Sequence, residues 1–176
     1  MRNVSTRRLC RAGIIAALYV ALTYVFAPFA FGPIQVRPAE ALCMLPLFFN
    51  EAIPSLWIGC ILSNLGSPYM FYDVVFGSLA TLLSALGTYI TGVFIKKDGV
   101  RFAVGGTFPV FFNALIIPFV IVFLGGRDAG YSSVAVAYFS SAASVAFTET
   151  IWVYGLGGLL YALILRLRKT SVRFLS

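Results

Sequence analysis

The chain has 176 residues, of which 60% are hydrophobic and only 11% are charged. About a quarter of the residues in a typical soluble domain are charged, so the composition excludes a soluble globular protein and indicates an integral membrane protein. The net charge of +7 could suggest nucleic-acid binding. The cations are gathered in short clusters and are not spread over one face, however, so we expect no nucleic-acid partner.

Motifs of common enzymes are missing from the sequence. There is no histidine, and the three cysteines, Cys10, Cys43 and Cys60, lie in or beside apolar runs without metal-ligand spacing. The phosphate-binding pattern G-x-x-x-x-G-K-[ST] is absent, and so is any Ser/His/Asp or Cys/His combination. An enzyme is therefore disfavoured, and we expect no catalytic residue, metal site or cofactor in this chain.

The distribution of positive charge predicts the topology. Lysines and arginines concentrate at cytoplasmic ends of membrane proteins, and a spanning helix uses about 20 apolar residues. Basic clusters at both termini place both in the cytoplasm and require an even number of spans. We therefore predict an all-α integral membrane protein of the cell (plasma) membrane, with one domain over residues 1–176 and six transmembrane helices. The clusters are Arg2, Arg7, Arg8 and Arg11; Lys96, Lys97 and Arg101; and Arg166, Arg168, Lys169 and Arg173.

Apolar runs and the turn residues between them predict helices over residues 9–26, 38–49, 52–65, 72–95, 102–124 and 132–165. The first run is too long for the core of a signal peptide, so we interpret it as the first span. The second helix is short and contains Pro46, and we expect it to be tilted or kinked.

Small residues recur four apart in the first helix, as Ala12/Ala16 and as Gly13/Ala17. This spacing lets another helix approach closely without lipid between them. The partner is either another helix of this protein or a separate membrane subunit.

The stretch 35–42, QVRPAEAL, brings an arginine and a glutamate close together in an apolar surrounding. Pro38 suits the first turn of a helix, where Glu40 is favoured by the helix dipole. Either Arg37 and Glu40 form an ion pair that anchors the helix end at the headgroups, or they line the mouth of a binding site.

Three further polar residues stand out in the predicted helices. Asp73 either caps the start of the fourth helix or faces a donor in an external cavity. Asn113 lies in the middle of the fifth helix, and Glu149 lies near the middle of the sixth. A carboxylate at that depth indicates a functional site by default, and the alternatives are a buried partner for Arg37 or Asn113, or a protonated side chain.

The predicted topology places most of these polar groups on the outer side of the membrane, where three carboxylates and two amides can converge on one pocket. Such a pocket suits a flat, polar heterocycle, because aromatic rings stack on its faces and carboxylates accept from its amino and ring N–H groups. Phe71 and Tyr138 are expected as further aromatic walls. The candidate substrate-binding residues are Arg37, Glu40, Asn64, Tyr72, Asp73, Asn113, Glu149 and Trp152.

Two segments resemble the queuosine-precursor transporter family (QueT-like), whose members are the substrate-binding S components of energy-coupling factor (ECF) transporters. They are FGPIQVRPAEAL over residues 31–42 and YDVVFGS over residues 72–78. The resemblance extends over nearly the whole chain in size, six-span layout and alanine-rich first helix. It implies an ECF S-component-like bundle.

The resemblance also implies a substrate and partners. The substrate would be a 7-deazaguanine base such as 7-aminomethyl-7-deazaguanine or queuine. The partners would be a transmembrane coupling subunit and two cytoplasmic ATPase subunits, which would use the ATP, beside the surrounding membrane lipid. In S components a small-residue face of the first helix docks the coupling subunit; Ala12 and Ala16 match that pattern, and Gly13 and Ala17 offer an adjacent register.

Three other functions stay open. The chain could be an S component for another vitamin, because pockets differ within one fold. It could be a self-sufficient proton-coupled secondary carrier with Glu149 as proton relay. It could also be a membrane scaffold without a ligand, which carboxylates scattered over the structure would favour.

Overall fold

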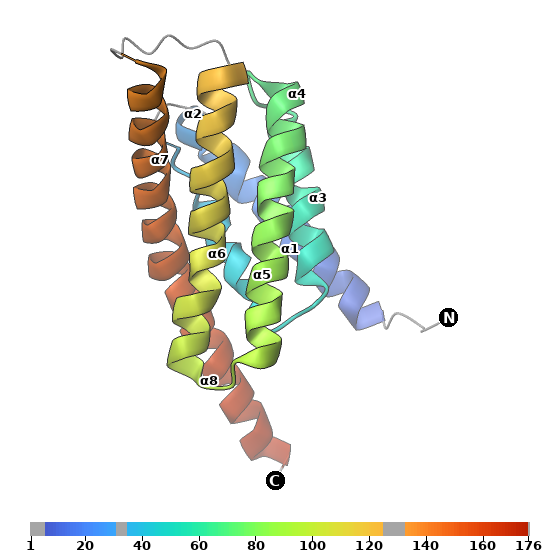
Figure 1. Cartoon of the computed structure of the whole chain (residues 1–176). Coiled ribbons are helices and arrows are strands. Elements are labelled where there is room, and N and C mark those ends of the chain that lie inside the picture. The colour runs from blue at the N-terminus through green and yellow to red at the C-terminus, as the bar shows by residue number, and fades with distance from the viewer. Residues whose placement is uncertain (1–5, 31–34, 125–132, 176) are drawn as a thin grey trace.

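The computed structural model describes residues 6–30, 35–124 and 133–175, with side chains as far as Thr170. The regular structure of these residues is entirely helical, which confirms the all-α prediction. Figure 1 shows the long helices packed side by side in a bundle, with α8 extending beyond the others at the C-terminal end.

The elements follow the predicted apolar runs closely. They are α1 (Thr6–Val25), α2 (Ala27–Ala30), the 3₁₀ helix η1 (Pro38–Leu47), α3 (Ala52–Asn64), α4 (Met70–Tyr72), the π-helical η2 (Asp73–Gly77), α5 (Ser78–Phe94), α6 (Asp98–Phe119), the π-helical η3 (Val120–Leu124), α7 (Val134–Thr150), the π-helical η4 (Ile151–Leu156) and α8 (Gly157–Leu175).

Among the described residues, four helices are long and apolar enough to cross a membrane. They are Thr6–Val25, Met70–Phe94, Asp98–Leu124 and Val134–Thr170, and Pro38–Leu47 and Ala52–Asn64 are shorter apolar helices. The count of six spans stays a prediction. The sixth helix, predicted to end at residue 165, is wrong in its end, because α8 continues to Leu175.

The short segment η1 lies in the interior of the bundle. All ten of its residues are buried, and it packs against α1, α3, α5, α6, η4 and α8. In Figure 1 it lies behind α5 and α6, enclosed by the longer helices. The other helices are therefore organised around this segment.

The α-helix expected over residues 38–49 is wrong in type, because η1 is a 3₁₀ helix that ends at Leu47. Its bonds run from the Glu40 N–H to the Arg37 carbonyl at 3.1 Å and from the Phe48 N–H to the Leu45 carbonyl at 2.9 Å. Pro46 has no N–H to give to an α-helical ladder. A 3₁₀ helix rises about 2.0 Å per residue, so this segment covers about 20 Å where an α-helix would cover about 15 Å.

Glycines on the surrounding helices make room for η1. A Cβ on Gly92 of α5 would lie 2.8 Å from the Leu47 carbonyl oxygen, and one on Gly105 of α6 would lie 2.9 Å from Leu47 Cδ2. A Cβ on Gly157 would lie 2.9 Å from Met44 Cγ. Close packing of this kind is what small residues provide in membrane proteins.

One arginine from each of the three predicted basic clusters lies at one end of the bundle, around two phenylalanines that follow η1. Arg2 and the Arg173 side chain lie outside the described residues. The Arg11 guanidinium lies 4.4 Å from the Phe49 ring centre, and those of Arg101 and Arg168 lie 4.9 Å and 4.8 Å from that of Phe48. Arg168 Nη2 also donates to the Phe48 carbonyl at 3.1 Å. We call this region the basic end; its orientation in the membrane stays a prediction.

Candidate functional site

A buried polar cluster surrounds Glu40, which is only 1% exposed. Tyr19 Oη donates to Glu40 Oε1 at 2.5 Å. Cys43 Sγ and Asn113 Nδ2 donate to Glu40 Oε2 at 3.1 Å and 3.4 Å. Donors from α1, η1 and α6 therefore hold this carboxylate in one position.

The 3₁₀ geometry of η1 explains part of this arrangement. With three residues per turn, positions three apart lie directly above one another, so Arg37, Glu40 and Cys43 form one row. Arg37 is buried, and its Nε donates to the Ala30 carbonyl at 3.1 Å. Arg37 also interacts electrostatically with Glu40, so a cation and an anion share this face of η1.

Glu149 approaches the same cluster from α7, at the point where this helix becomes the π-helical η4. It is 5% exposed, and the Asn113 amide donates to its carboxylate. Its Oε2 atom has no hydrogen-bond partner among the described residues. A buried polar atom left unsatisfied costs about 1–3 kcal/mol, and more when it is charged, so this oxygen is available to accept from another molecule. Short π-helical segments are common at functional sites.

A second buried group forms around Asp73. Ser67 Oγ donates to Asp73 Oδ2. Asn64 Nδ2 donates to the Asp73 carbonyl at 2.7 Å and to Cys60 Sγ at 3.3 Å. Arg37 interacts electrostatically with Asp73 as well as with Glu40, so its charge links the two groups.

The expectation that Asp73 caps the fourth helix is wrong. The helix begins three residues earlier, at Met70, and Asp73 lies in its first turns as a buried acceptor for the Ser67 hydroxyl. The fifth predicted helix also begins earlier than expected, at Asp98. The earlier start adds the apolar residues Met70 and Phe71 to the fourth predicted helix and residues 98–101, which include Asp98 and Arg101, to the fifth.

Six of the eight candidate substrate-binding residues are buried and lie in these two groups. They are Arg37, Glu40, Asn64, Asp73, Asn113 and Glu149. Their convergence removes the observation that would have favoured a scaffold without a ligand. Their role in binding stays a prediction.

The two aromatic candidates lie less deeply. Tyr72 and Trp152 are half-buried, and the Tyr72 ring packs edge-on against Phe71 at 5.7 Å. Phe71 itself is 71% exposed, so its expected place in the pocket wall is wrong. Residues two apart lie on different faces of a helix, and Phe71 precedes the buried Asp73 by two.

The expectation that Tyr138 forms a wall of this site is also wrong. It lies eleven residues before Glu149, which is about 16 Å along a helix. It lines a separate apolar groove between α6 and α7, with a volume of about 540 Å³. Its hydroxyl donates to the Leu115 carbonyl at 2.9 Å.

Sequence reasoning missed Tyr19, Cys43, Cys60 and Ser67 as members of the two groups. A signal for Tyr19 was present, because it lies four residues from both Ile15 and Thr23 on the buried face of α1. A buried tyrosine needs a partner for its hydroxyl. No comparable signal marks the two cysteines, which pack as small apolar side chains in most proteins.

The small residues of α1 divide between two faces. Ala12 and Ala16 are half-buried, and the Ala16 carbonyl lies 3.2 Å from where a Cβ on Gly59 of α3 would be. Gly13 and Ala17 are exposed, and a Cβ on Gly13 would have no neighbour within 4 Å. Among the described residues, the Gly13/Ala17 register is therefore the more open one.

Comparison with known proteins identifies a relative and a family. A part of the chain is 36% identical over 85 residues to the queuosine precursor transporter QueT of Lactococcus lactis subsp. cremoris (strain MG1363). The match covers 47% of this chain and 50% of that relative, so the chain spans about half the length of this curated relative. No solved structure matches significantly. The QueT transporter family model matches residues 9–166. The chain therefore belongs to the QueT transporter family, which is a family of transporters and not of enzymes.

Proposed function

We propose that this chain is the membrane subunit that binds a queuosine precursor, a 7-deazaguanine base, for uptake by an ATP-driven ECF transporter. Membership of the QueT family and the name of the Lactococcus lactis relative support the substrate. Because the sequence lacks the G-x-x-x-x-G-K-[ST] pattern, separate ATPase subunits would hydrolyse the ATP. The exposed Gly13/Ala17 face of α1 would dock the coupling subunit.

The observation that carries this proposal is the different state of two neighbouring buried carboxylates. Glu40 already accepts from three donors of the protein, whereas Oε2 of Glu149 accepts from none among the described residues. A guanine-like ring presents an amino group and a ring N–H side by side, and one carboxylate can accept from both. Glu149 would thus contact the base, and Glu40 would position Asn113 between the two acids.

A substituent on the base gives a further acid a task. An aminomethyl group carries an ammonium charge, which needs a second acid in a buried site. Asp73 is the candidate, because it is buried and its side chain accepts from the Ser67 hydroxyl, whereas Glu40 already accepts from three donors. A ligand cation would join a network in which Arg37 alternates with carboxylates.

The decisive experiment is calorimetry on the purified full chain in detergent. The ligands are 7-aminomethyl-7-deazaguanine, queuine, guanine and a panel of vitamins. Tight binding of a deazaguanine and much weaker binding of guanine is the expected result. Binding of a vitamin instead would keep the S-component role and overturn the substrate.

The substitution Glu149→Gln tests the assigned contact. A hydrogen bond to a charged group contributes about 1.5–3 kcal/mol, so we expect the affinity for the deazaguanine to fall about 10- to 150-fold. The matched control is Glu51→Gln, because Glu51 pairs with Arg11 at 2.8 Å at the basic end and should leave the affinity unchanged. Equal affinity of Glu149→Gln and the unaltered protein would contradict the contact.

The same pair of acids favours one alternative function, a proton-coupled secondary carrier. Glu149 interacts electrostatically with Glu40, and neighbouring acids within a membrane are typical of proton relays. The test is reconstitution of the chain alone in liposomes with an imposed pH gradient. Accumulation of the base by the chain alone would support the carrier and oppose the ECF role.

A further inference from the structure

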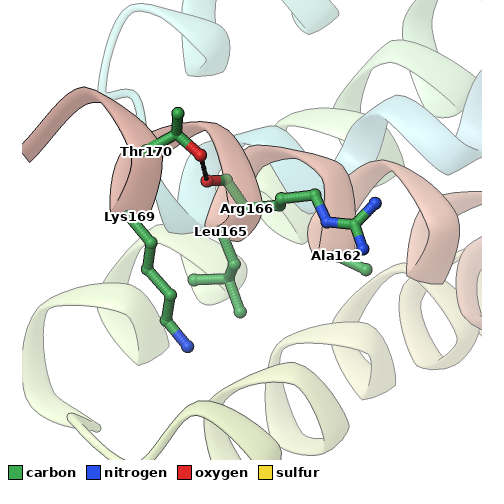
Figure 2. Close-up of a pocket in the computed structure, with 5 residues that line it drawn as sticks. All are labelled: Ala162, Leu165, Arg166, Lys169 and Thr170. Carbon is green, nitrogen blue, oxygen red and sulfur yellow. Dashed lines mark hydrogen bonds between the residues drawn. The ribbon is translucent and has the colours of Figure 1, made fainter. Parts of the chain in front are cut away.

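A cavity of about 680 Å³ lies on the surface of α8 near its C-terminal end. Ala162, Leu165, Arg166, Lys169 and Thr170 line it. Figure 2 shows Leu165 and Lys169 pointing to the same side of the helix, whereas the Arg166 side chain extends along the helix toward Ala162. We call it the α8 cavity; it is separate from the buried polar groups of the candidate site.

The lining of the α8 cavity combines positive charge with apolar surface. Arg166 and Lys169 are three residues apart, which places them on one face of the helix. Both are exposed, and neither forms an ion pair with a described residue. Thr170 Oγ1 donates to the Arg166 carbonyl at 3.0 Å, so its lone pairs remain available. Ala162 and Leu165 continue the lining as purely apolar side chains.

Contacts on the neighbouring face hold α8 against the bundle. Tyr161 Oη donates to the Asp98 carbonyl at 3.1 Å, and Arg168 lies over the Phe48 ring. These contacts orient the last turns of α8, so the two cations of the α8 cavity are presented together on a fixed helix.

The α8 cavity lies at the basic end, where Arg11, Arg101 and Arg168 pack on Phe48 and Phe49. Figure 1 shows that the last turns of α8 continue past the turn between α5 and α6. Arg166 and Lys169 lie in the last turns of the apolar segment Val134–Thr170, which is long enough to span a membrane.

We propose that the α8 cavity binds an anionic membrane phospholipid. Arg166 and Lys169 would bind the phosphate, and an acyl chain would lie on Ala162 and Leu165. A free phosphate ion shares the chemistry of the headgroup but would leave the apolar half of the lining unused. The occupant is therefore a lipid, and the inference stands whether or not the substrate proposed above is correct.

The test compares lipids on the purified full chain in detergent. Dioleoylphosphatidylglycerol is titrated by native mass spectrometry and by the shift in thermal-unfolding midpoint, with dioleoylphosphatidylcholine as the neutral lipid. We expect phosphatidylglycerol to bind more tightly and to raise the midpoint further. An anionic headgroup contributes about 1 kcal/mol per cation, so Arg166→Gln with Lys169→Gln should weaken its binding roughly 30-fold.

The matched control is Arg7→Gln with Arg8→Gln, which removes two exposed cations from the first turns of α1. This control should keep the preference for phosphatidylglycerol. Exchange of the two cations of the α8 cavity, Arg166→Lys with Lys169→Arg, keeps both charges and should also retain it. If the double glutamine variant does not fold, Lys169→Gln alone should weaken binding roughly 5-fold.

Three results would overturn the proposal. One is an unchanged affinity in the glutamine variants of the α8 cavity. Another is an equal loss in the Arg7/Arg8 control, which would show that only the net charge attracts the lipid. The third is a rise in the thermal-unfolding midpoint with inorganic phosphate that equals the rise with phosphatidylglycerol. That result would make the cavity a site for a soluble anion.

Discussion

The close packing of η1 against its neighbours leads to a prediction with three matched substitutions. Gly92→Ala puts a methyl group 2.8 Å from the Leu47 carbonyl oxygen and 2.9 Å from its Cα, and backbone atoms can yield only if η1 moves. Gly105→Ala meets the same residue, but at the end of its side chain, Cδ2 at 2.9 Å. Gly13→Ala meets nothing within 4 Å.

The expected magnitudes follow from these contacts. Overpacking costs about 1–3 kcal/mol, and replacing glycine by alanine in a helix gains about 1 kcal/mol. Gly13→Ala should therefore stabilise the protein, and Gly92→Ala should be less stable than Gly13→Ala by about 1–3 kcal/mol. Gly105→Ala should fall between them, because a leucine side chain can turn away. At about 2–4 °C per kcal/mol, thermal unfolding in detergent resolves this order.

Measuring the ligand affinity of the same three variants provides a second test. Because η1 carries Glu40, a displaced η1 should weaken binding in Gly92→Ala and leave it intact in Gly13→Ala. Equal stability and equal affinity of all three variants would refute the view that the glycine on α5 sets the position of η1.

Two further predictions concern α1. Tyr19→Phe removes the hydroxyl that donates to Glu40 at 2.5 Å and should lower the unfolding free energy by about 1.5–3 kcal/mol; Tyr24→Phe, whose hydroxyl makes a 3.4 Å contact at an exposed position, should have little effect. An equal loss in both variants would contradict the structural role of this bond. The proposed ECF role predicts that leucine at Gly13 and Ala17 abolishes ATP-driven uptake with the coupling and ATPase subunits, while the isolated chain keeps its ligand affinity. Retained uptake would exclude this face as the docking surface. The control is Ala143→Leu, at an exposed position of α7, which should leave uptake unchanged.

The helical segments could be predicted from the sequence because each is a long apolar run bounded by turn residues. The 3₁₀ geometry of η1 could not be predicted from the sequence. A 3₁₀ helix and an α-helix differ in period, and a period is visible only where apolar and polar positions alternate. All ten residues of η1 are buried, so its sequence from Pro38 to Leu47 is apolar at almost every position and carries little information about period.

The sequence predicted the charged and amide residues of the candidate site but not the residues that hold them. Charged and amide side chains are rare in this chain, so the few that occur within apolar runs stood out, and Glu40, Asn113 and Glu149 do lie together. The groups that hold them are ordinary residues of membrane helices. Tyr19 and Cys43 become recognisable as partners of Glu40 only when the path of η1 through the bundle is known.

The position of η1 also relates the two ends of the molecule. At one end it carries Glu40 in the candidate site, and at the other it leads directly into Phe48 and Phe49, on which arginines of α1, α6 and α8 lie. A ten-residue 3₁₀ helix is longer than this conformation usually sustains, and η1 persists within packing from six neighbouring elements. A shift of η1 toward α-helical geometry would shorten it by about 5 Å. Such a change would move the Glu40 carboxylate relative to the basic end, so the segment that positions the candidate site is also the one through which the two ends would be coupled.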